Sequence, residues 1–238
     1  MALGCSGSGS QDIRRSANIP LRTNFSMCGW FRITAYASNF AVLLGIDSGA
    51  GSNWTFMQTT NTNEISVGTS GGGFAFATTP AIGVPFFAAL SCSGTGSETV
   101  KGYWRYGGDK AFVVTSGVGQ SGSNNVMYAL GSSFGTSLNG VVDQVRAWDA
   151  VLSPAEFGVE SLSLFPVRRQ NLNSAPNCAV ISDLRDLGPN AYRWTKTGTL
   201  TDQRPLPGGR RMPMIPRAPL GKGSGAAAVD TSKFFFAA

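Results

Sequence analysis

The sequence predicts an all-β protein with two stacked antiparallel sheets, one short helix and an extended C-terminal arm. The chain has 238 residues, of which 31 are glycine and only 13% are charged. Short apolar runs recur at intervals of about ten residues, which is the spacing of a sandwich with many turns. Clusters of Gly, Ser, Asp and Asn separate these runs. A helical protein of this length would need far more Glu, Lys, Leu and Ala.

The first long strand is expected over residues 25–33. Phe25, Met27 and Phe31 alternate there with polar or small residues, and a period of two indicates a half-buried strand. Glycine-rich turns such as 71–73 separate the strands that follow. The other expected strands are 40–46, 53–59, 64–68, 73–77, 86–92, 100–106, 111–115, 126–131, 140–148 and 178–182.

A short helix is expected directly after the last long strand. Ser153 and Glu156 stand at the two positions of a capping box, and Pro154 lies between them at the first helical position. This pattern satisfies the free backbone N–H groups of a helix start. Apolar residues then follow at Phe157 and Val159, so we expect one face of this helix to be buried.

The chain divides into a flexible N-terminal segment (1–14), one folded domain (15–203) and a basic arm (204–238). The arm carries a charge of +5, whereas the rest of the chain has 13 positive and 12 negative residues. From Arg204 onward Pro, Gly, Arg and Ala dominate without periodicity, and this stretch has too little apolar surface to fold alone. A basic arm attracts nucleic acid, lipid or acidic protein surfaces, and charge alone leaves these open.

Neither cysteine nor histidine supports a metal or disulfide framework. The four cysteines are widely spaced, without a Cys-x-x-Cys pair, and the chain has no histidine. A zinc site is therefore not expected. Cys28 and Cys92 fall in apolar strands, where a free cysteine usually behaves as a small buried side chain. No signal-peptide core or membrane-length apolar run is present, so we expect synthesis in the cytoplasm and no membrane partner.

One stretch, residues 140–157, resembles the signature near the end of laminin G-like jelly rolls of the concanavalin A-like superfamily. It reads GVVDQVRAWDAVLSPAEF, with Ala147 in place of a larger apolar residue. The early strand FSMCGWF at 25–31 and the later strand VKGYWR at 100–105 are also similar to family strands. The resemblance covers roughly residues 15 to 200. It implies a jelly roll whose concave sheet and rim loops are the usual ligand surface.

The residues give little support for catalysis. No strand carries the paired carboxylates of a glucanase, and the absence of histidine excludes Ser-His-Asp and Cys-His nucleophiles. We therefore expect no enzyme and no cofactor. Asp143 stands alone on its strand and is interpreted as a structural carboxylate that binds backbone N–H groups or Arg146. Asp47 is a weak calcium candidate, because its loop neighbours supply few oxygen ligands.

Aromatic residues are the candidates for glycan contact. Trp54, Trp104 and Tyr106 could stack on sugar rings, and the alternative is that they fill the sandwich core. Trp30 and Trp148 lie on the two strands with the family resemblance, and we expect them to pack between the sheets.

The expected function is that of a non-enzymatic structural protein that decorates a viral (bacteriophage) particle. Three consecutive phenylalanines in the arm would be a solubility liability unless a partner covers them. The expected partners are other virion subunits and further copies of the chain, in the virion, and nucleic acid is not expected. The alternative is a carbohydrate-binding module or adhesin that recognises cell-surface glycans. The arm residues expected to mediate assembly are Arg210, Arg211, Arg217, Phe234, Phe235 and Phe236.

Overall fold

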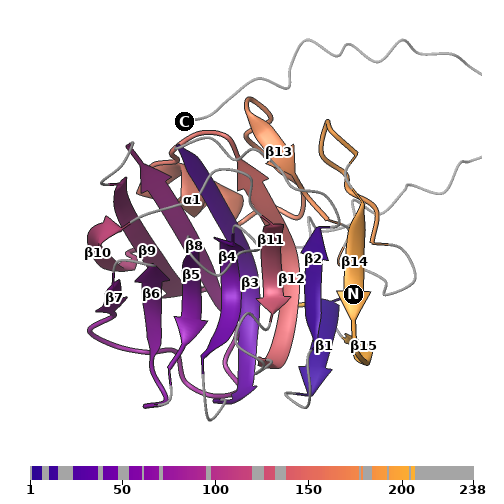
Figure 1. Ribbon diagram of the computed structural model, residues 1–238, viewed down its shortest axis with the longest axis horizontal. Coiled ribbons are helices and arrows are strands. Elements are labelled where there is room, and N and C mark those ends of the chain that lie inside the picture. The colour runs from indigo at the N-terminus through magenta and orange to yellow at the C-terminus, as the bar shows by residue number, and fades with distance from the viewer. Residues whose placement is uncertain are drawn as a thin grey trace, which may run out of the picture.

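In the computed structural model the strands form two stacked antiparallel sheets, with one helix outside them (Figure 1). This arrangement confirms the predicted all-β sandwich with one short helix. The structure describes residues 2–6, 11–15, 24–36, 40–47, 54–60, 62–69, 72–94, 98–119, 126–131, 138–176, 178, 184–191, 193–203 and 205–206.

The first sheet has eight strands, in the order β10-β9-β8-β3-β12-β1-β15, with β13 paired to β12. Its longest strands lie at the centre, where β3 and β12 pair over most of their length. Strands from the two ends of the domain therefore meet beside each other. The bounds are β1 (Ala2–Ser6), β3 (Phe25–Ala35), β8 (Phe86–Ser93), β9 (Glu98–Tyr106), β10 (Val113–Gly119), β12 (Asn139–Trp148), β13 (Leu172–Ser174) and β15 (Leu200–Gln203).

The second sheet has seven strands, in the order β14-β2-β11-β4-β5-β6-β7. Consecutive hairpins join β4 to β7, and the two strands β2 and β14 come from opposite ends of the domain. The bounds are β2 (Asp12–Arg15), β4 (Ala41–Asp47), β5 (Trp54–Thr59), β6 (Ile65–Thr69), β7 (Gly72–Ala75), β11 (Val126–Gly131) and β14 (Trp194–Thr197).

Strand β3 shows how the main core forms. Phe25, Met27 and Phe31 are fully buried in the cluster that fills the space between the two sheets. Cys28 and Trp30 point the other way and belong to a second buried cluster on the outer side of the eight-stranded sheet. The predicted alternation is therefore confirmed, but both faces are buried instead of one. Cys28 and Cys92 are free and buried, as expected.

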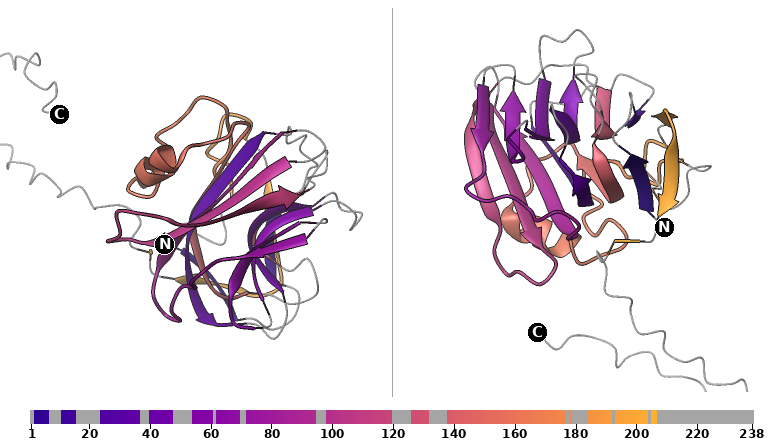
Figure 2. Two further views of the ribbon diagram at one scale, coloured as in Figure 1. Left: turned by 90° about the vertical axis from the view of Figure 1, so that its left-hand side faces the viewer. Right: turned by 90° about the horizontal axis from the view of Figure 1, so that it is seen from below.

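The outer face of the eight-stranded sheet is covered by helix α1 (Pro154–Glu160) and the segment after it. Figure 2 shows this helix outside that sheet, on the side away from the seven-stranded sheet. The capping box is present: the Ser153 hydroxyl accepts a hydrogen bond from the Glu156 N–H, and the Glu156 carboxylate accepts one from the Ser153 N–H. Phe157 then packs into the second cluster, which confirms the predicted helix and its buried face.

The N-terminal segment corrects one prediction. Residues 1–14 were expected to be flexible, but β1 lies in the eight-stranded sheet between β12 and β15, and β2 lies in the other sheet. Leu3 pairs with Val142 and is fully buried in the main core. A short Gly/Ser-rich run has no strong strand signal of its own, and here strands distant in sequence supply its hydrogen bonds.

Other differences concern the end of the domain and two tryptophans. Strands β13, β14 and β15 were not predicted, and most of the expected strand 178–182 lies outside the described residues. Trp30 and Trp148 are buried as expected, but on the outer face of the eight-stranded sheet rather than between the sheets. They lie there because α1 and its neighbours provide a second apolar layer.

Candidate functional site

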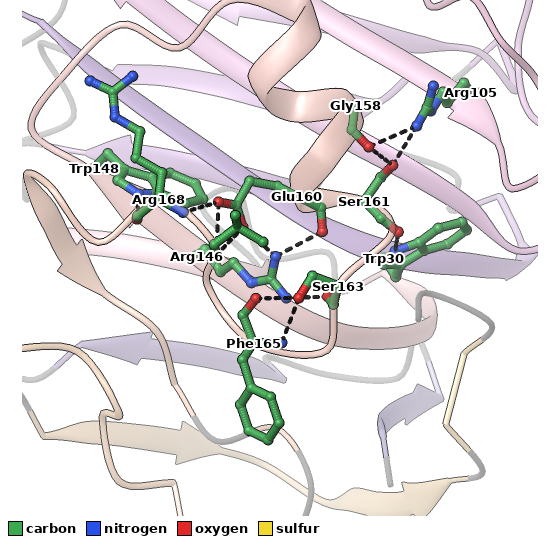
Figure 3. Close-up of polar contacts among 11 residues, drawn as sticks. Trp30, Arg105, Arg146, Trp148, Gly158, Glu160, Ser161, Ser163, Phe165 and Arg168 are labelled. Atoms are coloured by element: carbon green, nitrogen blue, oxygen red, sulfur yellow. Dashed lines mark hydrogen bonds and ion pairs between the residues drawn. The ribbon is translucent and has the colours of Figure 1, made fainter. Parts of the chain in front are cut away.

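A buried ion pair links the centre of the eight-stranded sheet to the segment that covers it. Arg146 of β12 is 2% exposed, and its guanidinium lies 2.5 Å from the carboxylate of Glu160, which is 1% exposed (Figure 3). The same guanidinium donates to the backbone carbonyls of Glu160 and Ser163, at 2.8 and 2.5 Å. Burial of two charges costs free energy unless both are well hydrogen-bonded, and here the guanidinium meets several acceptors.

The Glu160 carboxylate is equally well satisfied. Its Oε1 accepts hydrogen bonds from the backbone N–H groups of Val167 and Arg168, at 3.0 and 2.7 Å. A single carboxylate thus holds the end of α1, the following loop and the central strand together. Because the pair is enclosed and both carboxylate oxygens have partners, it acts as a structural link between the sheet and residues 154–168, which we call the cover.

Three further side chains of the sheet hold the cover from below. The Trp30 indole N–H donates to the Ser161 carbonyl at 3.1 Å, and that of Trp148 donates to the Arg168 carbonyl at 2.8 Å (Figure 3). Arg105 donates to the Gly158 carbonyl and to the Ser161 hydroxyl. Burial lowers the pKa of Arg105. Polar contacts within an apolar cluster therefore bind the cover to the sheet between residues 158 and 168.

Asp143 binds the start of the C-terminal arm at residues 205–206, which we call the arm root. It lies on β12 and is 6% exposed, and its Oδ2 accepts a hydrogen bond from the backbone N–H of Leu206 at 3.2 Å. Leu206 itself is 5% exposed and packs in the second cluster. Burial raises the pKa of Asp143 to about 6, against the opposing effect of the Leu206 N–H. The predicted binding of a backbone N–H by the Asp143 carboxylate is confirmed.

Gln144 lies beside Asp143 at an irregularity in β12. The register with β3 shifts between Asp143 and Arg146, and Gln144 has a φ of 54°, in the left-handed region that non-glycine residues rarely adopt. The Gln144 amide is close enough to Asp143 to lower the pKa of that carboxyl, yet neither buried amide atom meets hydrogen-bond geometry with any partner. Gln144 therefore lies at a local irregularity of the strand, and its amide is buried.

Two adjoining cavities form an apolar groove next to this irregularity. One, of about 320 Å³, is lined by Asp143 and Gln144, and the other has a volume of about 290 Å³. We call their union the 165–187 groove. The two cavities adjoin each other and share three wall residues, Phe165, Pro166 and Leu187. Pro205, at the root of the arm, lines the larger cavity.

The rim of the 165–187 groove is unusually apolar for a surface. Phe165 is 66% exposed, Leu187 is 54% exposed and Leu164 is 50% exposed. In Figure 3 the Phe165 ring points away from the Arg146–Glu160 network. Val167 and Leu162, on the same covering loop, are also more than half exposed. Contiguous exposed apolar residues of this kind are typical of contact surfaces.

The aromatic glycan candidates are not brought together into one platform. Trp104 is 4% exposed, packs in the core between the sheets and donates its indole N–H to the Thr78 carbonyl. Tyr106 is half-buried and contacts Trp104 edge to face. The burial of Trp104 argues against direct contact with a sugar, because its ring faces are covered by the core. Tyr106 keeps partial access to solvent.

Trp54 and Asp47 lie on the other sheet. They are paired residues at the adjoining ends of β5 and β4. The structure describes both only as strand residues, so the calcium and glycan predictions stay predictions there. The predicted arm residues Arg210, Arg211, Arg217, Phe234, Phe235 and Phe236 lie outside the described residues.

The described part of the chain has neither a metal-binding cluster nor a membrane-spanning helix. It holds no group of three or more His, Cys, Asp or Glu side chains placed to bind a metal ion. It also holds no helix with the length and apolar character of a membrane span.

Sequence reasoning missed the groove and most of the cover network. Leu206 stands in a Pro- and Gly-rich stretch, which hides its role as a buried anchor. Arg146 and Glu160 are 14 residues apart, and neither spacing nor composition indicates that they pair. The unusual backbone of Gln144 has no sequence signal, because glycine and asparagine are the residues that normally mark such positions.

Comparisons with known proteins identify the fold. No family model and no curated protein sequence matches the chain. The heptameric SAP-like pentraxin of Limulus polyphemus is similar, with a TM-score of 0.54, 10% identity, and coverage of 84% of this chain and 93% of the pentraxin. Domain 4 of AbnA, an arabinanase of Geobacillus stearothermophilus, has a TM-score of 0.48 at 15% identity and covers 63% of this chain and 71% of that domain.

A third similar structure is the sialidase of Trypanosoma rangeli. Its TM-score is 0.42 at 15% identity, and the match covers 56% of this chain and 22% of the sialidase. The fold conclusion rests on the pentraxin, which matches over most of both chains. The protein thus has a two-sheet jelly-roll fold. At 10% identity the pentraxin shows the fold and nothing finer.

Proposed function

We propose that this chain is a non-enzymatic structural protein that decorates a viral particle, such as that of a bacteriophage, and that its C-terminal arm holds it to neighbouring subunits. The observation that carries the proposal is the way the start of the arm is attached to the sheet. Leu206 is buried on the eight-stranded sheet, and its N–H binds Asp143 on the central strand β12. A force applied to the arm would therefore act on β12 and on its partner β3, which pair over most of their length.

A second observation concerns the surface around that point of attachment. The 165–187 groove is apolar and exposed, and Pro205 of the arm root lines it. A decorating protein needs a contact surface close to its anchor, and this groove provides one. The pentraxin with the similar fold is heptameric, so a jelly roll of this kind is compatible with assembly into closed rings.

The non-enzymatic part of the proposal follows from how the charged residues of β12 are used. Arg146 and Glu160 are enclosed and bind each other, and the Asp143 carboxylate binds a backbone N–H of the arm root. Among the described residues, these charged groups are the ones that would most suggest catalysis, and each is bound to a structural partner. We infer that they stabilise the cover and the arm and take no part in a reaction.

Negative-stain electron microscopy of the purified full-length chain tests the proposal. We expect regular assemblies, or ordered attachment to particles of the same virus. Serine at Arg210, Arg211 and Arg217 together with Phe234–Phe236 should abolish both. A full-length chain that stays monodisperse and binds no particle would contradict the proposal, as would an arm variant that assembles as well as the wild type.

Glycan recognition is the second candidate function. The observation that favours it is the pairing of Trp54 with Asp47 at one end of the seven-stranded sheet, which no described helix covers. The two positions are Cα partners, and an aromatic residue and a carboxylate are residue types that bind sugars. Host-surface glycans are ligands that a virion protein of this fold could use.

A glycan array with the full-length chain tests this second function. Trp54→Ala should abolish binding if the paired residues form the site, whereas Trp104→Phe, a change within the core, should leave it intact. Equal loss in both variants would indicate a general defect of the fold. No binding by the wild type would remove the glycan function and leave the assembly function untouched.

A further inference from the structure

We propose that the 165–187 groove receives the segment Phe234–Phe236 from the C-terminal arm of a second copy of this chain. The proposal rests on the proposed function, which assigns the arm to attachment, and it names both the receiving surface and the partner. The adjoining cavities, of about 320 and 290 Å³, offer an apolar channel of the size a short peptide requires. Its walls contain Leu164, Phe165 and Leu187, each at least half exposed.

The groove also carries one polar feature that selects its occupant. The nitrogen and the oxygen of the Gln144 amide are buried and meet hydrogen-bond geometry with none of the described residues, although the amide lies close enough to Asp143 to lower the pKa of that carboxyl. A primary amide offers donors and an acceptor on adjacent atoms, which is the complement of a peptide unit. A phosphate or a metal ion would use only half of that capacity. Gln144 also lines the larger cavity of the groove.

The arm supplies a segment that matches these walls. Phe234, Phe235 and Phe236 are consecutive, and their aromatic side chains gain most from removal from water. The backbone between them provides peptide groups for the Gln144 amide. No other stretch of the arm has more than two adjacent large apolar residues.

The length of the arm allows its end to reach a second copy. Phe234 follows Leu206 by 28 residues. A flexible chain of that length spans about 30 Å, comparable with the width of a folded domain of this size. Because Pro205 lines the groove, each arm starts beside the surface that would receive the partner's segment. Two copies can therefore exchange arms and form two equivalent contacts, which strengthen each other through the effective concentration of the second contact.

The experiment uses three full-length variants and sedimentation velocity. The groove variant is Phe165→Ser with Leu187→Ser, at positions that tolerate polar residues because both are more than half exposed. The arm variant has serine at Phe234, Phe235 and Phe236. The control is Ile82→Ser with Val118→Ser, which changes two similarly exposed apolar residues on other elements, at 57% and 62% exposure.

We expect the wild type and the control to self-associate alike. Loss of each buried phenylalanine should weaken association by about 10-fold, so the arm variant, which lacks three, should be about 1000-fold weaker. The groove variant should be weakened to a similar extent. Neither variant should self-associate, but a mixture of the two should form a complex, because one supplies an intact arm and the other an intact groove.

The mixture decides where the arm docks. If both variants are monomeric and their mixture gives no complex, each arm occupies its own groove and the proposal is wrong. If the groove variant associates as strongly as the wild type while the arm variant does not, the groove is not the receiving surface. In that case the proposed attachment through the arm survives. A monomeric wild type that still decorates particles would likewise overturn exchange between copies without overturning the proposed function.

Discussion

Replacement of Asp143 with asparagine should stabilise the protein at neutral pH and have little effect in acid. The Asp143 carboxyl is 6% exposed and lies under the arm root, where burial raises its pKa from 3.8 to about 6. The neutral acid is therefore favoured in the folded state. Asparagine has the same shape, carries no charge, and its carbonyl oxygen can still accept the hydrogen bond of the Leu206 N–H.

The sign and size of the effect follow from the two pKa values. The folded chain binds the proton more tightly, so the stabilising contribution of this group is fully present below pH 3.8 and is lost as the pH rises through about 6. A difference of about two pKa units corresponds to about 3 kcal/mol. The Asp143→Asn variant should therefore exceed the wild type by up to about 3 kcal/mol at pH 7.5 and by less than about 1 kcal/mol at pH 4.

Urea unfolding of both proteins between pH 4 and pH 8 measures this difference directly. Other titrating groups are common to both chains, so the difference between the two unfolding free energies isolates position 143. We expect it to rise through pH 4–6 and then to level off. A variant that is destabilised at every pH, or a difference that shrinks as the pH rises, would show that the folded state favours the charged carboxylate and would refute the reasoning.

Three further substitutions probe the cover and the irregularity in β12. Arg146→Met leaves the Glu160 carboxylate buried without its partner and should cost about 3–5 kcal/mol of unfolding free energy. Addition of Glu160→Gln should restore part of this loss in the double variant. An Arg146→Met variant within about 1 kcal/mol of the wild type would contradict this. Gln144→Gly relieves a φ of 54° and should raise stability by about 1 kcal/mol, seen as a higher Tm. Ser153→Ala removes the helix cap and should cost about 1 kcal/mol, whereas Ser153→Asp should retain most of the stability.

The sandwich and its single helix were predictable because their signals are local. In β3 the period of two assigns Phe25 and Met27 to one face and Cys28 to the other, and the structure keeps that assignment. The capping box at Ser153 likewise depends only on residues three positions apart. Such patterns can be recognised in a sequence because the interacting groups are neighbours along the chain.

The short strands at the two ends of the domain escaped prediction because partners far away in sequence stabilise them. Leu3 in β1 is buried because it pairs with Val142 and Asp202, and the segment Ala2–Ser6 has little strand preference alone. The second buried layer was hidden for the same reason. The sequence shows that Trp30 and Trp148 are aromatic residues suited to burial. Only the position of α1 decides which face of the sheet buries them.

The sequence by itself therefore determined the class of fold, the alternation of its long strands and the start of its helix, because these depend on contacts between residues close in the chain. The tertiary structure alone decided the groove, the anchoring of Leu206 by Asp143 and the Arg146–Glu160 pair. Each of these joins groups from separate elements. Long-range packing sets their geometry, and no local pattern encodes the distance between them.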